Sequence, residues 1–295
     1  MSSTFFTASP EWRWFIVAYF FLGGLAGGSY FLATLMDRFG PEQDRPLVRL
    51  GYLVAFPLVC VCGFVLTVDL GRPERFWHML VQSQTFRPML KTFSPMSTGA
   101  WVLLLFSGCA FVSFAGTLAE RGWPDWGILR LGSPAAPAGR LVTGLGAILG
   151  LYLAGYTGVL ISVTNRPIWA DTTLLGLTFL SSAASTSAAL LILLGAWMGL
   201  SRDRLRRLER FDRSALILEA GAIVALVASL GRIATVWLDG WGILLAGVVL
   251  GGIAVPLLLD RERRPERRPV WIAPALVLLG GLVLRMVIIL SADRL

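Results

Sequence analysis

Apolar residues dominate this chain in eight long segments, which short polar or charged stretches separate. Each segment is close to the ~20 residues that a helix needs to cross the hydrocarbon core of a membrane. The alternation typical of barrel strands is missing, so these segments are predicted to be helices. They cover residues 14–36, 47–69, 97–118, 140–162, 173–199, 214–236, 241–259 and 270–291. The pattern predicts an all-α integral membrane protein with eight transmembrane helices.

Composition points the same way. The chain has 295 residues, only 15% of them charged, and a mean hydropathy of +0.71. A soluble domain of this length needs a more charged surface, so lipid is expected to cover most of this protein. The first residues lack the basic start and the small-residue cleavage site of a signal peptide. We therefore expect the first span to stay in the mature protein.

The net charge of +8 comes mostly from arginines in short loops. If Arg49 and Arg140, at the ends of the second and fourth spans, are counted with the adjacent loops, 17 Lys and Arg residues fall on one side and 7 on the other. Because positively charged loops stay in the cytoplasm, both termini are predicted to lie on the outer, periplasmic side. This topological signal explains the charge better than nucleic-acid binding does, so no nucleic-acid partner is expected.

Candidate ligands for metals and haem are few. Cys60, Cys62 and Cys109 all lie in apolar spans, and His78 is the only histidine. This set predicts neither an iron–sulfur cluster nor a zinc site, and one histidine excludes bis-histidine haem. We expect no metal and no redox centre in this chain. Electrons for any redox reaction must then come from a partner subunit.

Ionisable and aromatic residues are predicted to gather at the outer membrane edge, where the first, second and fourth spans meet it. At 1.5 Å per residue, Tyr19 and Tyr156 lie ~8 and ~9 Å deep, while Asp69 ends the second span. A carboxylate or imidazole near a phenol suits proton exchange with a quinone or quinol. Asp69, Tyr156 and His78 are therefore the candidate catalytic residues. Loops add further polar groups to this edge: Arg72, Asn165, Arg166, Trp169 and Asp171.

The loop after the second span carries four positive charges, on the side that such loops are expected to avoid. Two interpretations stay open. The topology rule is statistical and tolerates exceptions. Alternatively, the loop is a docking face for an acidic partner or a lipid headgroup, which its mixture of aromatic and arginine residues favours. The candidate docking residues are Arg72, Arg75, His78, Arg87 and Asp171.

The first span contains a glycine run, GGLAGG at 23–28. The pairs Gly23/Gly27 and Gly24/Gly28 allow another helix to approach closely, which favours a packing role. The other interpretation is that bare backbone leaves room for a flat ligand.

Glu219, Arg232 and Arg285 are predicted inside the membrane. Counted from the predicted starts of their spans, Glu219 and Arg285 differ by roughly 15 Å in depth, too far for a direct pair. A buried arginine is costly and needs a partner or water. For Glu219 and Arg285, a structural bond and a place on a proton path stay equally open.

Three segments resemble the NrfD/polysulfide-reductase type of membrane subunit. They are DLGRPERFWHML at 69–80, SPMSTGAW at 94–101 and TNRPIWADTTLLGLTFLSSAASTSAA at 164–189. The resemblance implies two four-helix bundles, with a quinone (menaquinone or ubiquinone) bound near the outer face of the first. Residues 1–200 would then hold the first bundle and the fifth span, and residues 201–295 the rest of the second bundle.

The resemblance also assigns residues to roles. By position in the family, Asp69 ends the second span, Tyr156 is the tyrosine of the fourth, and Tyr19 lies in the quinone wall of the first. His78 falls in the loop that faces the partner. The resulting quinone-binding candidates are Tyr19, Gly23, Gly24, Gly27, Asp69, Tyr156, Asn165 and Arg166.

Partners and location follow from the same resemblance. Such proteins are multi-pass subunits of the bacterial cytoplasmic membrane and pair with a ferredoxin-like iron–sulfur subunit, often alongside a molybdopterin catalytic subunit. The expected function is electron exchange between the quinone pool and the iron–sulfur partner, as one subunit of a quinone-dependent oxidoreductase.

Two other classes of function remain as alternatives. A secondary transporter or proton-conducting channel would place its site at the midplane between repeats, and this chain shows neither a shared motif between its halves nor a midplane cluster. A purely structural membrane anchor would assemble with its partners without binding quinone.

Overall fold

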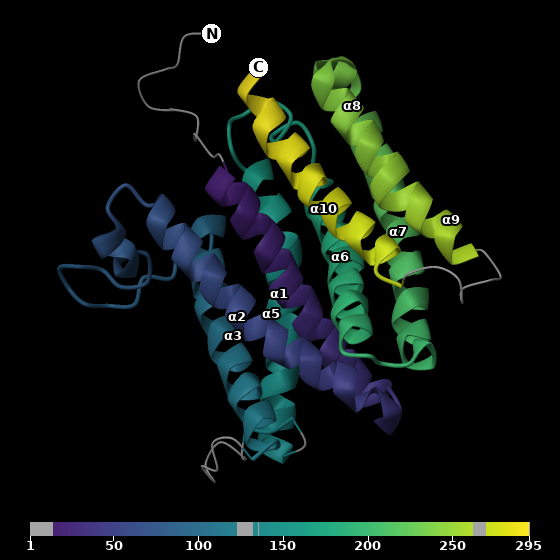
Figure 1. Cartoon of the computed structure of the whole chain (residues 1–295). Helices are drawn as coiled ribbons and strands as arrows, with labels where there is room; N and C mark the ends of the chain where they lie inside the picture. The colour runs from purple at the N-terminus through teal and green to yellow at the C-terminus, as the bar shows by residue number, and fades with distance from the viewer. Residues whose placement is uncertain (1–13, 123–131, 135, 262–269, 295) are drawn as a thin grey trace.

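The computed structural model describes residues 14–122, 132–134, 136–261 and 270–294, and within them the regular structure is helical (Figure 1). Eight segments of this described part are long and apolar enough to cross a membrane, judged by length and composition. The predicted all-α fold with eight candidate spans is thus confirmed, and the protein is a multi-pass membrane protein. The first five spans are α1 (Trp14–Phe39), α2 (Arg45–Asp69), α3 (Pro95–Ala119), α5 (Pro137–Ser162) and α6 (Leu175–Trp197).

The last three spans are less regular. The sixth joins α7 (Arg202–Leu230) to a 3-10 segment, η3 (Gly231–Leu238). The seventh is made of α8 (Gly240–Gly247), a π-helical stretch η4 (Val248–Ala254) and α9 (Val255–Arg261). The eighth is α10 (Ile272–Leu290).

Proline and serine residues set where several helices begin. Pro46, Pro95 and Pro137 lie in the first turns of α2, α3 and α5. The fixed φ of proline suits a first turn, where its missing N–H would have no partner anyway. Ser94 caps α3 by accepting a hydrogen bond from the Ser97 N–H at 3.4 Å. The start of α3 is therefore held at a defined position.

The start of α7 differs most from the prediction. The apolar pattern predicts a span from residue 214, but the helix begins at Arg202. The earlier residues, RDRLRRLERFDR, include many good helix formers, which continue a helix although their charge ends the apolar run. The start of the apolar run therefore indicates where the membrane-spanning part begins, and not where the helix begins.

Helix α1 lies at the centre of the arrangement and packs against α2, α5, α6 and α10 (Figure 1). A Cβ on Gly27 would overlap the backbone of Gly150 on α5, and a Cβ on Gly28 would overlap the Ser187 side chain on α6. Small residues therefore let α5 and α6 approach α1 closely. Helix α1 thus contacts helices of both predicted bundles, and these contacts do not separate one bundle from the other. The predicted division of the chain into residues 1–200 and 201–295 therefore stays a prediction.

Two ends of the molecule can be distinguished. Trp14, Asp69, the α2–α3 loop and Leu290 lie at one, which we call the Asp69 end, and the opposite one is the Arg38 end (Figure 1). The sides of the membrane to which they belong stay a prediction.

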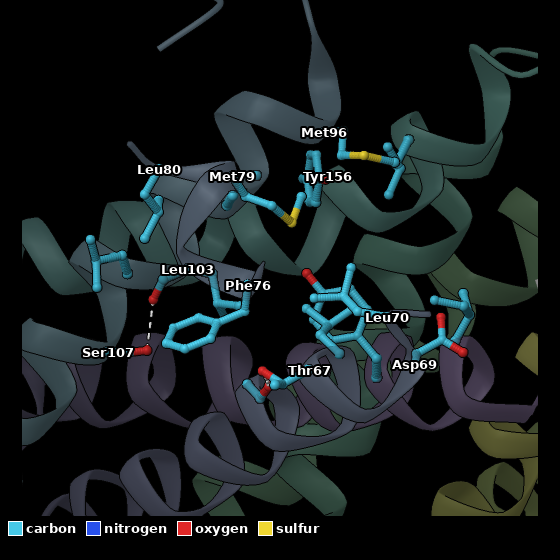
Figure 2. A pocket seen from close by; sticks show the side chains of 18 of the residues that line it. Thr67, Asp69, Leu70, Phe76, Met79, Leu80, Met96, Leu103, Ser107 and Tyr156 are labelled. Carbon is cyan, nitrogen blue, oxygen red and sulfur yellow. Dashed lines mark hydrogen bonds between the residues drawn. The ribbon is translucent and has the colours of Figure 1, made fainter. Parts of the chain in front are cut away.

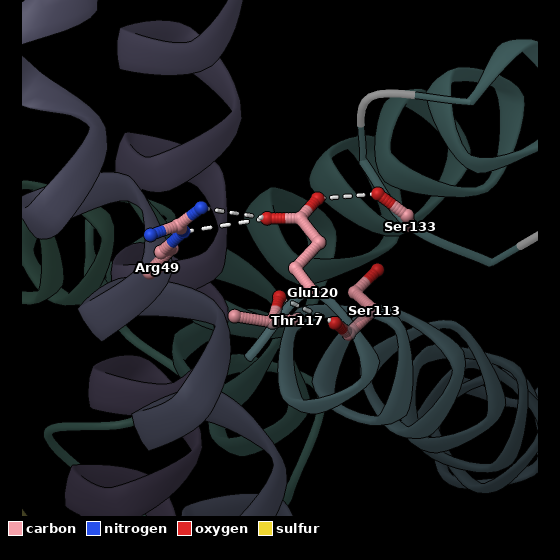
Figure 3. A network of polar contacts seen from close by, with 5 residues as sticks. All are labelled: Arg49, Ser113, Thr117, Glu120 and Ser133. Carbon is pink, nitrogen blue, oxygen red and sulfur yellow. Dashed lines mark hydrogen bonds and ion pairs between the residues drawn. The ribbon is translucent and has the colours of Figure 1, made fainter. Parts of the chain in front are cut away.

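Ion pairs and hydrogen bonds hold the Arg38 end together. The Arg49 guanidinium on α2 binds the Glu120 carboxylate after α3 at 3.2 Å, and Ser133 donates a hydrogen bond to the other carboxylate oxygen (Figure 3). Asp44, which is buried, pairs with Arg207 on α7 at 3.1 Å. Some of the arginines counted as a topological signal therefore also connect helices.

Candidate functional site

A cavity of about 460 Å³ lies at the Asp69 end, among α1, α2, α3 and α5 (Figure 2). Its inner wall comes from α1 and α5, and its other sides from α2 and α3. The α2–α3 loop closes it with Phe76, Met79 and Leu80, while Met96 at the start of α3 completes the cover. Most lining side chains are apolar, which is typical of small-molecule sites that orient a ligand with few polar groups.

Three predicted residues, Tyr19, Asp69 and Tyr156, line this cavity together. Tyr19 on α1 and Tyr156 on α5 are 3% and 6% exposed. Within the described part of the chain, neither phenol hydroxyl is hydrogen-bonded to another residue. Asp69 ends α2 at the exposed rim of the cavity. The cavity thus has two buried hydroxyls with free donors and one solvent-accessible carboxylate.

Two further hydroxyls line the cavity, but their hydrogens are already engaged. Thr67 donates to the carbonyl oxygen of Gly63 at 2.8 Å, and Ser107 donates to that of Leu103 at 2.7 Å. Such bonds to the preceding turn are common for hydroxyl residues inside helices. Each of these oxygens can therefore act as an acceptor for a ligand.

The position of Tyr156 is set by its neighbours. A Cβ on Gly99 of α3 would overlap the ring and hydroxyl of Tyr156, so only glycine leaves room for the phenol there. On its other side the ring of Tyr152 stacks at 5.7 Å, with an interplanar angle of 15°. Gly99 lies in the segment SPMSTGAW, which the sequence singled out without assigning it this role.

The α2–α3 loop is held by hydrogen bonds within itself and to α3. Its hairpin is held by a Met89 N–H to Leu80 carbonyl bond of 2.8 Å, and the Trp101 indole on α3 donates to the Met89 carbonyl at 3.2 Å. The Phe76, Met79 and Leu80 side chains of the loop cover the cavity, whereas Arg72, Arg75 and Arg87 are exposed and do not line it.

His78 belongs to this loop and does not line the cavity among the described residues. It lies in a 3-10 segment, η2 (Pro73–Met79), is half-buried, and its ring contacts Trp77 edge-on at 4.0 Å. Trp77 in turn stacks on Phe86 at 6.1 Å. The structure thus separates His78 from the two tyrosines with which the sequence grouped it.

The α5–α6 connection also stays outside the cavity lining. Asn165 is exposed, while Arg166 lies over the Trp169 ring at 5.6 Å and reaches the Ala292 carbonyl at 3.5 Å. Trp169 is fully buried and its indole N–H donates to the Ile288 carbonyl at 2.8 Å. This connection is therefore held against the end of α10 by hydrogen bonds.

Asp171 stabilises an unusual backbone in the same connection. Ile168 has φ of +71°, a left-handed conformation that a β-branched residue rarely adopts. The Asp171 carboxylate accepts the Ile168 N–H at 3.1 Å. Asp171 is exposed, as a docking residue should be, but it also has this local structural contact.

The described lining does not include Gly23, Gly24 or Gly27. A Cβ on Gly24 would lie 3.0 Å from Arg285 and 3.1 Å from the Cβ of Ala183, and Gly27 faces Gly150. At Gly23 the nearest atoms, of Cys62 and Tyr19, are 3.9 Å away. The packing interpretation therefore accounts for Gly24 and Gly27.

Glu219 and Arg285 meet at a buried polar network on α6. Ser185 donates to the Glu219 carboxylate at 2.6 Å, and Arg285 donates to Ser182 at 3.1 Å. Ser182 also lies against Glu219, whose carboxylate interacts electrostatically with the Arg285 guanidinium. Glu219 and Arg285 are 2% and 0% exposed.

The depth assigned to these two residues from the sequence was wrong. Because α7 begins at Arg202, Glu219 lies 17 residues along its helix and not five, while Arg285 lies 13 residues after Ile272. The two side chains thus reach a similar depth and share the serines between them. Arg232, in η3 just after α7, is exposed and outside this network.

The described residues include no group of three or more His, Cys, Asp or Glu side chains arranged to hold a metal ion. The lining residues that the sequence analysis did not assign are mainly apolar, and Phe76, Met79 and Met96 lie in two of the quoted segments. Their presence in these segments is the feature of the sequence that could have identified them as residues of the site.

Comparisons with known proteins agree with the resemblance. The family model described as polysulphide reductase, NrfD, matches residues 3–293. Protein NrfD of Escherichia coli is 28% identical over 231 residues, which cover 77% of this chain and 73% of that protein. A polysulfide reductase chain of Wolinella succinogenes is 27% identical, covering 62% of this chain and 58% of that one. A selenate reductase subunit of Mesobacillus selenatarsenatis is 39% identical over 28% of this chain and 20% of its own length.

Proposed function

Since the chain belongs to the polysulphide reductase NrfD family of membrane subunits, we propose that it exchanges electrons between the quinone pool and an iron–sulfur partner. The supporting observation is the cavity that Tyr19, Tyr156 and Asp69 line beneath the α2–α3 loop. In this proposal the chain is one subunit of a quinone-dependent oxidoreductase in the bacterial cytoplasmic membrane, with its Asp69 end outward.

The cavity fits a quinone in size and chemistry. Its volume of about 460 Å³ lies within the range of small-molecule sites. The ring of such a ligand is apolar apart from its two oxygens. The lining matches this, because it offers two free phenol donors and most of its other side chains are apolar. None of the described lining residues carries a fixed positive charge, as suits a neutral ligand.

Each of the three residues has a distinct task. A bound quinone supplies two-electron, two-proton redox chemistry. The Tyr19 and Tyr156 hydroxyls donate hydrogen bonds that orient the ring oxygens. With a quinol bound, the Asp69 carboxylate would accept protons and pass them to water, since it lies at the exposed rim. In this proposal the exchange takes place on the outer side, to which we assign the end of α2 where Asp69 lies.

The α2–α3 loop links the cavity to the partner. Arg72, Arg75 and Arg87 are exposed on the same loop that covers the cavity with Phe76 and Met79, so that a subunit bound to these arginines would sit close to the ring. A ferredoxin-like iron–sulfur subunit with an acidic surface fits this face. A molybdopterin catalytic subunit would then bind that partner. His78 and Asp171 complete the proposed docking residues at this end.

We also propose a second role, proton conduction through Glu219 and Arg285. The observation that favours it is the buried hydroxyl network of Ser182 and Ser185 between the two charges. Intramembrane ionisable groups of this kind are frequent parts of proton relays. The competing role is a structural bond between α6, α7 and α10.

The experiment that tests the main proposal is purification of the tagged chain from native membranes in mild detergent. Stoichiometric quinone, iron and acid-labile sulfide in the preparation are the expected results. Iron and sulfide without quinone would instead support a purely structural anchor. A chain that carries none of the three would support a transporter or channel.

A further inference from the structure

The cavity reaches the surface of the protein at α3, because Leu104 both lines it and is 47% exposed. Its inner wall, with Tyr19 and Tyr156, belongs to the buried helices α1 and α5. The opposite wall is formed by Gly63 and Leu66 of α2 and by Leu104 of α3. The outer surfaces of α2 and α3 face lipid here, since Phe64 and Leu104 are 69% and 47% exposed.

Aromatic contacts close the seam between α2 and α3 below this opening. Phe56 on α2 packs against Phe111 and Phe114 on α3, with ring centroids 5.3 and 5.1 Å apart. Gly63 lies seven residues, or ~10 Å, nearer the Asp69 end than Phe56, and Ser107 four residues, or ~6 Å, nearer than Phe111. Above the opening the seam is covered by the loop. The result is a window of limited height between the two helices.

Gly63 keeps this window wide. A Cβ at Gly63 would meet no atom within 4 Å, although Gly63 lines the cavity. The space beside its backbone is therefore part of the opening and not a helix contact. On the facing side Ser107 is the smallest side chain of α3 in the lining apart from Gly99 and Ala100.

We propose that the isoprenoid tail of the quinone leaves the cavity through this window, between Gly63 and Ser107, into the lipid. The inference rests on the proposed function and adds the route by which the ligand enters. The free phenol donors lie on the inner wall. At the window the Ser107 hydroxyl already donates to the Leu103 carbonyl, and the neighbouring Leu66 and Leu104 are apolar, so the ring points inward and the tail outward. A cavity of about 460 Å³ holds the ring and the start of the tail, and the remainder must lie among lipid chains.

A second groove, of about 600 Å³, lies on the other side of Tyr156, among α3, α5 and α6. It is lined by Thr98, Tyr152 and Leu177 but by neither Tyr19 nor Asp69. The stacked rings of Tyr152 and Tyr156 stand between this groove and the cavity. A quinone with its tail in this groove would therefore have its ring outside the cavity, away from Tyr19 and Asp69. For this reason we prefer the window as the exit of the tail.

The test compares quinols with long and short tails. The chain is purified together with its accompanying partners, and reduction of the iron–sulfur clusters by each quinol is measured. Gly63→Phe and Ser107→Phe place a ring in the window from either side. Gly108→Phe is the matched control, because Gly108 is on α3, outside the lining, with no atom within 4 Å of a Cβ.

The expected result is a loss of about tenfold in kcat/KM for the long-tailed quinol with either window variant. The loss for the tail-less analogue should be clearly smaller in both window variants, and Gly108→Phe should stay near the unsubstituted values with both quinols. Equal losses for both quinols, or no loss for either, would overturn the window. A selective loss in Leu177→Trp instead would move the exit to the groove. If the unsubstituted complex oxidises neither quinol, the proposed function itself fails.

Discussion

The phenol ring of Tyr156 on α5 lies against the bare Cα of Gly99 on α3, in the space that a Cβ would occupy. Tyr152 stacks on the ring from the same helix, and its hydroxyl donates to Thr98 at 3.4 Å. The phenol is thus held between two helices with its hydroxyl in the cavity. Gly99 and Tyr156 are far apart in the sequence, so this contact exists only in the folded chain.

Replacing Gly99 with alanine should displace Tyr156 from the cavity wall. We expect Gly99→Ala to lower quinol turnover by about 10- to 100-fold while the subunit still assembles, because the clash falls on one ring. Gly108→Ala on the same helix meets no atom within 4 Å and should be neutral. Cluster reduction by quinol in the two variants measures the effect. Equal turnover in both would contradict the positioning of Tyr156 by Gly99.

Asp69 is expected to matter for turnover and not for assembly. Its carboxylate forms no ion pair with the described residues, so Asp69→Asn removes charge without breaking a contact. We expect the variant to keep its partners and to lose about 100-fold or more in quinol turnover. Asp203→Asn, in the exposed first turn of α7 and outside the cavity, serves as the control. Normal turnover in Asp69→Asn would remove Asp69 from the mechanism.

The arginines of the α2–α3 loop should act on partner binding alone. Arg75→Gln combined with Arg87→Gln is expected to weaken retention of the iron–sulfur subunit, most clearly as salt is raised, because exposed charges are screened. Quinone bound to the isolated chain should not change. The pair Arg206→Gln and Arg210→Gln at the Arg38 end is the control. Co-purification across a salt series provides the measurement, and equal retention in both pairs would argue against this docking face.

The glycine run of α1 offers a test of packing against ligand binding. A Cβ on Gly27 overlaps the Gly150 backbone, so Gly27→Ala should destabilise the protein by about 1–3 kcal/mol. Gly23→Ala meets its nearest atoms at 3.9 Å and should be tolerated. Thermal aggregation in detergent reports the difference. If Gly23→Ala instead abolishes quinone binding without loss of stability, the glycines form part of the ligand wall.

For Glu219 and Arg285, the two proposed roles give different results. On a proton path, Glu219→Gln should keep quinol oxidation but reduce the number of protons moved per quinol in reconstituted vesicles. As a structural bond, the pair should affect stability alone: Arg285→Met would cost about 3–5 kcal/mol by leaving a buried carboxylate unpaired. Adding Glu219→Gln to it would then restore part of the loss. An unchanged proton ratio in Glu219→Gln would exclude the path.

The sequence predicted the fold well because a membrane span leaves a long apolar run. It also predicted that Tyr19, Asp69 and Tyr156 lie near one another, since depth can be counted from the ends of spans. The depth predicted for Glu219 was wrong, because the charged start of α7 is helical although it is not apolar. Counting from the end of the apolar run then gave the wrong position.

The direction in which a residue faces around its helix was the harder problem. Gly24 and Gly27 lie on the same helix as Tyr19, yet they face Arg285 and Gly150 and not the cavity. In a helix surrounded by other helices every face is apolar, so hydrophobic periodicity does not indicate which neighbour a residue meets. Gly99 and Gly63 were missed for the same reason.

The most direct test of the central claim is photoaffinity labelling of the purified complex with an azidoquinone, followed by mapping of the labelled peptides. Our account predicts saturable labelling, which excess quinone competes away, in the loop around Phe76 and Met79 and in α3 between Met96 and Ser107. Competed labelling only among α7, η3 and α8, or none that quinone competes away, would contradict the assignment of this cavity to the quinone.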